Sequence, residues 1–587
     1  MRRRRTLVAV TAGALSLALA ACGGGSASDD GTDDGGGDDA AKPVQNAAVG
    51  KVFAPSDKKG GTIRMATTEN WDSVDPGDTY YALSWNLVRL YGRSLVMYKS
   101  APGEEGNTLV PDLAESLGEP SADNKTWTYT LREGIKFDDG TPVTSKDVKY
   151  AVARSLDKEV LPNGPGYFND WLDVGDYKGA FKDKNLDNFT AVETPDDRTV
   201  VFKLKAPFAG FDYMAMLPST VPVPQAKDTG TKYKEKVIAT GPYKFESYAQ
   251  DKNFTLVRND QWDPATDPNR PALPDKITMT YGVNADDLDN RLLAGELDVD
   301  VSGVGVQAAA QGRILTDEAL KARSDLVPDN RLSFTAINGD VPPLDNVECR
   351  RAIEYAVDRT GYSQAYGGPQ VAPIATHLTP PGIAGSTDFD LYPAGPDSKG
   401  DVAKAKEALT KCGQPNGFET NAAFRQDRPK EKAAAENLQQ SLARVGIKLT
   451  LKGYPTGDYF ELYAGKPAFA KQQKLGLMQH AWGADWADGY GFLSQIIDSR
   501  VIRASGNYNL TVKSKKVDSM IDQALQEQDK DARDKLWADI DKQVMEEAFI
   551  LPGVFYAGIL YRPETLTNVF STAAYGMYDY VGMGVKQ

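Results

Sequence analysis

The N-terminal segment indicates in which compartment this chain folds and which residues belong to its folded body. Four arginines, Arg2 to Arg5, precede an uncharged run from Thr6 to Ala21 that is mostly Ala, Val and Leu. A basic end, an apolar stretch and then small residues are typical of a signal peptide. The run is too short for a permanent membrane helix, which needs about 20 apolar residues. We therefore expect residues 1–21 to be a signal peptide and the rest to fold outside the cytoplasm.

The apolar run ends in Leu19, Ala20, Ala21 and Cys22, which resembles the bacterial lipobox. In a lipobox the cysteine is acylated and becomes the new N-terminus, so we expect a lipid on Cys22 to hold the protein at the outer face of the cell membrane. The alternative is an ordinary secreted protein cut at an Ala-x-Ala site. Because Arg4 and Arg5 also loosely fit a twin-arginine signal, the export route is left open.

A tether is expected after Cys22. Residues 23–41 consist of Gly, Ser, Asp, Ala and Thr, with six Asp and no Lys or Arg. Such a composition has nothing apolar to bury and stays disordered and flexible. We assign residues 22–59 to the lipidated cysteine and a disordered tether. Without the signal arginines and the six Asp, the net charge of −14 becomes −12 for the body, which disfavours nucleic acid and anionic lipid as partners.

The body reads as a mixed α/β protein of several hundred residues. Residues 126–131 alternate polar and apolar side chains, which indicates a strand. Helices are predicted from Ser145, from Asp345 with Glu348 as its capping partner, from Asp401, and over residues 430–445. No second long apolar run occurs, so no further membrane span is predicted.

The remaining cysteines, Cys349 and Cys412, lie on the apolar stripes of two of these helices. An exported protein folds in an oxidising compartment, so we expect them to form a disulfide. In the chain-entropy model the bridge contributes about 4 kcal/mol. The alternative is two unbridged thiols in the core.

The sequence carries no mark of an enzyme. It lacks His-Glu-x-x-His, Gly-x-Ser-x-Gly, Cys-x-x-Cys and a phosphate-binding loop, and its only histidines are His377 and His480. A histidine triad, a three-histidine zinc site and a resident metal or cofactor are therefore not expected. Because carboxylates are abundant, a glycosidase pair is not excluded. A lipid-anchored surface hydrolase remains the alternative class.

Two groups of aromatic residues suggest a binding protein instead. The first comprises Trp71, Tyr80, Tyr81 and Trp85; the second comprises His480, Trp482, Trp486 and Tyr490, with Asp485 and Asp488 among them. Most of these rings are expected in the core. A buried aspartate is costly unless it meets a cation or hydrogen-bond donors, and a ligand ammonium is both.

Several motifs resemble family 5 extracellular solute-binding proteins, the peptide- and nickel-type receptors of ABC importers. Residues 127–151, Trp-Thr-Tyr-Thr-Leu-Arg-Glu-Gly-Ile-Lys-Phe-Asp-Asp-Gly-Thr-Pro-Val-Thr-Ser-Lys-Asp-Val-Lys-Tyr-Ala, are similar to the family signature. Residues 73–76, 240–245, 342–359 and 401–413 resemble further family motifs in the family's order.

The resemblance implies an α/β, two-lobed, periplasmic-binding-protein-like fold of type II with three sub-domains and a hinge. Lobe 1 would comprise residues 60–106, 232–332 and 557–587, with 107–231 as an inserted sub-domain, and lobe 2 would comprise residues 333–556. Closure of the lobes around a solute would let the protein dock on ABC permease subunits in the membrane. We expect a monomer.

The resemblance also implies site residues. Trp482-Gly483-Ala484-Asp485 is similar to the Trp-x-Ala-Asp segment whose aspartate pairs with a peptide ammonium, so Asp485 would bind the amine and Trp482 would wall the pocket. By their place in the chain, Tyr80, Tyr81 and Ala82 would meet the peptide backbone. Trp486 and Trp71 are added from position alone.

The motif departs from the family after Asp485, where Trp486-Ala487-Asp488-Gly489 replaces Tyr-Pro-Asp-Pro. Gln479 stands where some peptide binders have arginine, so no cation for a peptide carboxylate can be located. A sugar or another amine-bearing solute is therefore the alternative ligand, and nickel is disfavoured by the two histidines.

Overall fold

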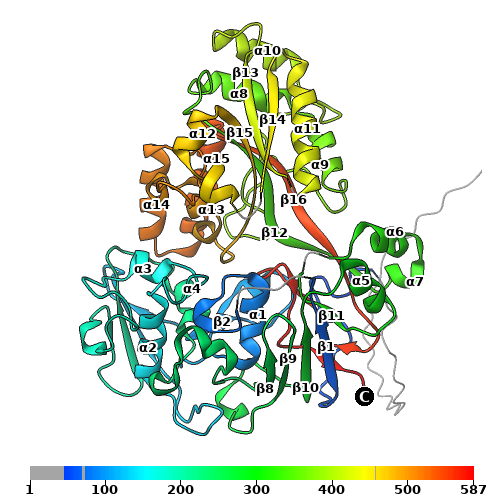
Figure 1. Ribbon diagram of the computed structural model, residues 1–587. Coiled ribbons are helices and arrows are strands. Elements are labelled where there is room, and N and C mark those ends of the chain that lie inside the picture. The colour runs from blue at the N-terminus through cyan, green and yellow to red at the C-terminus, as the bar shows by residue number, and fades with distance from the viewer. Residues whose placement is uncertain (1–44, 69–72, 304, 427, 456–457) are drawn as a thin grey trace, which may run out of the picture. The chain divides into compact units, whose positions relative to one another are not determined.

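A computed structural model describes residues 45–68, 73–303, 305–426, 428–455 and 458–587 (Figure 1). The predicted signal peptide, Cys22, the Asp-rich segment and Trp71 lie outside the described residues. The described part contains three main sheets, named below after one strand of each. None of its helices is both long and apolar enough to cross a membrane.

The β1 sheet has five strands in the order β11-β1-β10-β9-β8. β1 runs parallel to β10 and β11, whereas β9 is antiparallel to β10 and β8. Alternate residues such as Ile63 and Met65 are fully buried, as expected where successive side chains point to opposite faces. The strands are β1 (Thr62–Ala66), β8 (Tyr243–Ala249), β9 (Asn253–Arg258), β10 (Lys276–Thr280) and β11 (Val299–Asp300).

The β5 sheet has four strands in the order β4-β5-β7-β6. The predicted strand at 126–131 is confirmed as β5, which buries Trp127 and Tyr129. The predicted helix from Ser145 is confirmed as α2 (Ser145–Ser155), whose start is fixed by a capping box between Thr144 and Asp147. The strands are β4 (Glu119–Pro120), β5 (Thr126–Thr130), β6 (Val192–Glu193) and β7 (Thr199–Lys203).

The β12 sheet has five strands in the order β14-β13-β15-β12-β16. Its long strands β12 and β16 pair antiparallel from Ser324 and Tyr561 to Ala336 and Ile550. Figure 1 shows α9 and α11 on one side of this sheet and α12 to α15 on the other. The strands are β12 (Ser324–Ile337), β13 (Glu419–Arg425), β14 (Lys448–Tyr454), β15 (Leu475–Gly483) and β16 (Ile550–Tyr561).

The other helices and short strands connect or cover these sheets. The helices are α1 (Ala82–Tyr91), α3 (Tyr167–Trp171), α4 (Phe211–Ala215), α5 (Ala285–Leu293), α6 (Ala308–Thr316), α7 (Glu318–Lys321), α9 (Arg359–Ala365), α11 (Pro429–Ala443), α12 (Pro467–Gln472), α13 (Gly489–Ile497), α14 (Lys515–Gln526) and α15 (Lys530–Glu547). The short strands are β2 (Val96–Tyr98), β3 (Leu109–Pro111), β17 (Leu566–Thr567), β18 (Ser571–Thr572), β19 (Met577–Tyr578) and β20 (Gly584–Val585).

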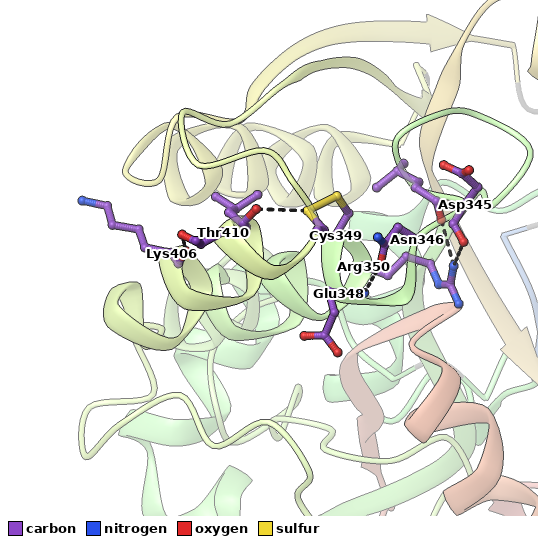
Figure 2. The surroundings of a disulfide bond; sticks show 10 residues. Asp345, Asn346, Glu348, Cys349, Arg350, Lys406 and Thr410 are labelled. Carbon is purple, nitrogen blue, oxygen red and sulfur yellow. Dashed lines mark hydrogen bonds between the residues drawn. A yellow bond between two sulfur atoms is a disulfide. The ribbon is translucent and has the colours of Figure 1, made fainter.

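A disulfide joins Cys349 of α8 (Val347–Ala356) to Cys412 at the end of α10 (Val402–Lys411), which confirms the predicted bridge (Figure 2). The predicted start of α8 needs a correction. The helix begins two residues later than expected, because the side chain of Asn346, not Asp345, accepts the hydrogen bond from the first free amide, that of Glu348.

The predicted tether also needs a correction at its C-terminal end. Residues 22–59 were expected to be disordered, yet Ala48 is fully buried and donates its amide to Asp325. Phe53 forms a β-bridge with Val569, and the amide of Ser56 donates to Asn568. The apolar residues of this stretch allow residues 46–56 to pack on the folded body. The sub-domain boundaries themselves stay a prediction.

Candidate ligand-binding site

Asp485 stands in a short loop between β15 and α13 that backbone and side-chain bonds hold in place. Its amide donates to the carbonyl of Gly491 at 3.0 Å. The carboxylate of Asp488, which caps α13, accepts from the amide of Gly491 at 2.8 Å and from the indole of Trp486 at 2.9 Å. Asp488 is therefore bonded within the loop, whereas the carboxylate of Asp485 bonds to residues from outside it.

Two tyrosines from distant parts of the chain donate hydrogen bonds to the Asp485 carboxylate. Tyr167 comes from α3, and Tyr80 precedes α1. Tyr508 interacts electrostatically with the same carboxylate. The surrounding protein raises the pKa of Asp485 to about 7, against the smaller opposite effect of the two tyrosine hydrogen bonds. Among the residues that the structure describes, none forms an ion pair with Asp485, so the carboxylate has donors but no cation.

The predicted tryptophans are packed beside this carboxylate. Trp482 is 9% exposed, donates its indole N–H to the carbonyl of Phe492 at 2.8 Å, and has its ring centroid 5.1 Å from that of Tyr508. Trp486 is almost fully buried, with its ring centroid 4.8 Å from that of Tyr167. Both rings therefore support the tyrosines that surround Asp485.

The other predicted residues occupy different positions. Tyr80 stacks on Trp85 with 5.6 Å between ring centroids, next to the start of α1, where Tyr81 and Ala82 are exposed. Gly483 pairs with Arg331 of β12. The structure thus brings Tyr80 to Asp485, and Tyr81 and Ala82 follow Tyr80 in the chain. Their roles in binding stay predictions, and Trp71 lies outside the described residues.

Sequence reasoning missed Tyr167 and Tyr508. Neither lies in a motif, and each reaches Asp485 only through the tertiary fold. The position of Asp485 in an aromatic segment indicated that hydrogen-bond donors should surround it. The sequence did not indicate which residues supply these donors.

His480 is buried among aromatic rings. The His480 ring lies between those of Phe334 and Phe460, at centroid distances of 4.7 and 4.8 Å. Burial, with a smaller effect of Arg425, lowers the pKa of His480 to about 3, so the ring stays neutral at ordinary pH. Within the described ranges, no group of three or more His, Cys, Asp or Glu side chains is arranged to hold a metal ion.

Comparisons with known proteins identify the family of this chain. Residues 108–502 match the model of the family described as bacterial extracellular solute-binding proteins, family 5 Middle. A glutathione-binding protein of Escherichia coli is 25% identical over 520 residues, which cover 86% of this chain and 91% of that protein. A dipeptide-binding protein of Bacillus subtilis is 26% identical over 471 residues, which cover 78% and 81%.

One solved structure is similar over nearly its whole length. A protein described as clavulanic acid biosynthesis oligopeptide binding protein 2 has a TM-score of 0.90 and 41% sequence identity, with 93% of this chain and 99% of that chain covered.

Proposed function

Because the chain belongs to the family 5 bacterial extracellular solute-binding proteins, we propose that it captures an oligopeptide and delivers it to an ABC importer. Its fold is the two-lobed, type II fold of periplasmic binding proteins, with three sub-domains and a hinge. Members of this family are solute-binding proteins, so the chain is a binding protein and not an enzyme. This membership removes the hydrolase alternative.

The main support for the peptide proposal is the environment of the Asp485 carboxylate. Its carboxylate is held by the hydroxyls of Tyr80 and Tyr167 and is surrounded by protein, but no cation among the described residues balances it. A peptide α-ammonium supplies both the missing charge and strong donors. Three similar proteins, named as glutathione-binding, dipeptide-binding and oligopeptide-binding proteins, support the same ligand class.

Ligand capture would work by population shift. Asp485 follows β15 of the β12 sheet, whereas Tyr167 and Tyr80 belong to the predicted inserted sub-domain and lobe 1. A ligand that contacts residues of both parts binds the closed state more tightly and so shifts the equilibrium toward it. The closed form would then dock on the permease.

We further propose that a lipid on Cys22 anchors the receptor at the extracytoplasmic face of the cell membrane and that it acts as a monomer. The lipobox-like Leu19-Ala20-Ala21-Cys22 supports the anchor. Cells fed a labelled fatty acid should incorporate the label into the unchanged protein and not into the Cys22→Ser variant. Equal labelling of the two proteins, or no labelling of the unchanged protein, would contradict the anchor.

Native mass spectrometry of the purified protein tests the ligand class. We expect adducts that denaturation releases as short peptides, and we expect the Asp485→Asn variant to lose most of them. Because this change keeps the size of the side chain, the variant should unfold at a similar temperature. A sugar or a metal complex in place of peptides would contradict the proposal and favour the alternative ligand.

A further inference from the structure

A cavity of about 540 Å³ lies beside the Asp485 site. Its walls come from α3, from residues 205–207, and from the region of α13, residues 498–503 and α14. Tyr167 connects the cavity with the Asp485 site, because it lines the cavity and its hydroxyl donates a hydrogen bond to Asp485. Cavities of roughly 300–1,000 Å³ are the usual size for small-molecule sites. The cavity can therefore hold part of a ligand whose amine is bound at Asp485.

Aromatic and apolar side chains form part of the cavity wall. The indole N–H of Trp171 donates to the hydroxyl of Tyr490 at 3.1 Å, and Pro207 and Leu525 also line the cavity. The bond between Trp171 and Tyr490 crosses from the predicted inserted sub-domain to the predicted lobe 2. An organic ligand in the cavity would thus touch both parts of the protein.

Two of the three cations in the cavity wall are already occupied. Arg500 binds the carboxylate of Asp498 at 2.8 Å and also pairs with Asp522. The ammonium of Lys205 donates to the backbone carbonyls of Asn169 at 2.8 Å and Asp170 at 3.3 Å. These groups hold the walls in place and have little capacity left for a ligand.

Arg503 is the third cation, and its guanidinium is nearly uncommitted. Its side chain is 72% exposed, and its one ion pair among the described residues is with Asp170 at 3.9 Å. That separation is too long for a hydrogen bond. Burial raises the pKa of Asp170, and Arg503 is the cation that opposes this effect most. Arg503 can present its fork of N–H donors to a ligand carboxylate, which matches that geometry.

We propose that Arg503 binds the carboxylate of the ligand and that the cavity holds the carboxyl-terminal part of a zwitterionic peptide. The ammonium then lies at Asp485 and the carboxylate at Arg503, with Tyr167 between them. This inference rests on the proposed function as a peptide receptor. It supplies the carboxylate-binding cation that Gln479 does not provide.

The test compares alanine peptides of two to five residues that carry either a free or an amidated C-terminus. Calorimetric titration of the unchanged protein should show about tenfold tighter binding of the free acid than of the amide at the best length, as expected for one charge-assisted contact. Arg503→Gln should bind both forms equally and as weakly as the unchanged protein binds the amide. Asp170→Asn, which removes the competing carboxylate, should keep or increase the preference.

Arg313→Gln provides a matched control, because Arg313 is an exposed arginine of α6 that is absent from the cavity wall. It changes the net charge equally and should keep the tenfold preference. A preference that survives in Arg503→Gln would overturn this inference and leave the receptor proposal standing. Failure of every peptide, acid or amide, to bind the unchanged protein would overturn both. Thermal unfolding of each variant checks that it is folded.

Discussion

Lowering the pH from 7.5 to 5.5 should weaken peptide binding more than tenfold, because the ammonium pairs only with ionised Asp485. The surrounding protein raises the pKa of this carboxyl to about 7 in the free protein. Its ionised fraction then falls from about three quarters at pH 7.5 to about 3% at pH 5.5, a loss of roughly 25-fold. The peptide amine, with a pKa of about 7.7–8.0, becomes more protonated over the same range. This gain reduces the roughly 25-fold loss of affinity by about a third.

The sign follows from linkage. A bound ammonium favours the charged carboxylate and so lowers the pKa of Asp485 in the complex. The contribution of Asp485 to the affinity is therefore full above the free-state pKa of about 7 and is lost as the pH falls below it. Tyr80 and Tyr167, which face the same carboxylate, have pKa values raised by burial and stay neutral throughout this window.

Calorimetry in two buffers of different ionisation enthalpy measures both the affinity and the protons released. At pH 6 we expect release of about 0.9 proton per peptide, the fraction of Asp485 that is protonated before binding. Asp485→Asn is the control. It retains Asp488, whose pKa burial raises to about 6, and any proton release left in the variant does not come from Asp485. An affinity that is unchanged between pH 7.5 and 5.5 would refute the assignment of the amine to Asp485.

Three further variants test the framework around the site. Arg154→Met should lower the free energy of unfolding by about 3–5 kcal/mol in urea titration, because buried Arg154 binds Asp75 and Asp228 at 2.8 Å and its loss leaves two buried carboxylates unpaired. An unchanged urea midpoint would contradict that role. Replacing Cys349 and Cys412 by Ser should lower the free energy of unfolding by about 4 kcal/mol, because the bridge closes a loop of 63 residues. Peptide affinity should stay within twofold. A large loss of affinity in the folded variant would show that the bridge shapes the site. Gly491→Ala should lower the free energy of unfolding by about 1–3 kcal/mol and weaken peptide binding. The reason is that a new Cβ would lie 2.6 Å from the ring of Trp486 and displace the Asp485 loop. Full affinity would show that the loop tolerates this shift.

Local features of the fold could be predicted from the sequence because they depend on neighbouring residues. The alternation in β5, the capping residue of α2 and the apolar stripe of α8 are each contained within about a dozen residues. The disulfide could be assigned because the expected mature body has only two cysteines besides Cys22. Asn346 was missed as a cap because Asp345 is an equally suitable residue one position earlier.

The surroundings of Asp485 could not be predicted, because they depend on long-range contacts. Tyr167 lies 318 residues away in the chain, and its segment has no periodicity or motif that indicates a site. Arg503 was likewise indistinguishable from other arginines until the partners of Arg500 and Lys205 were known. The segment around Ala48 was misjudged because a few apolar residues within a polar stretch gave no sign of the surface that covers them.

The most direct test of the peptide-receptor proposal is the affinity of co-purified peptides before and after acetylation of their amino terminus. Calorimetric titration should show that acetylation weakens binding to the unchanged protein at least tenfold, as expected for loss of a charge-assisted hydrogen bond at a partly enclosed carboxylate. The same modification should have little effect on Asp485→Asn, which has already lost the charge. Equal affinity of free and acetylated peptides for the unchanged protein would contradict recognition of the amine by Asp485.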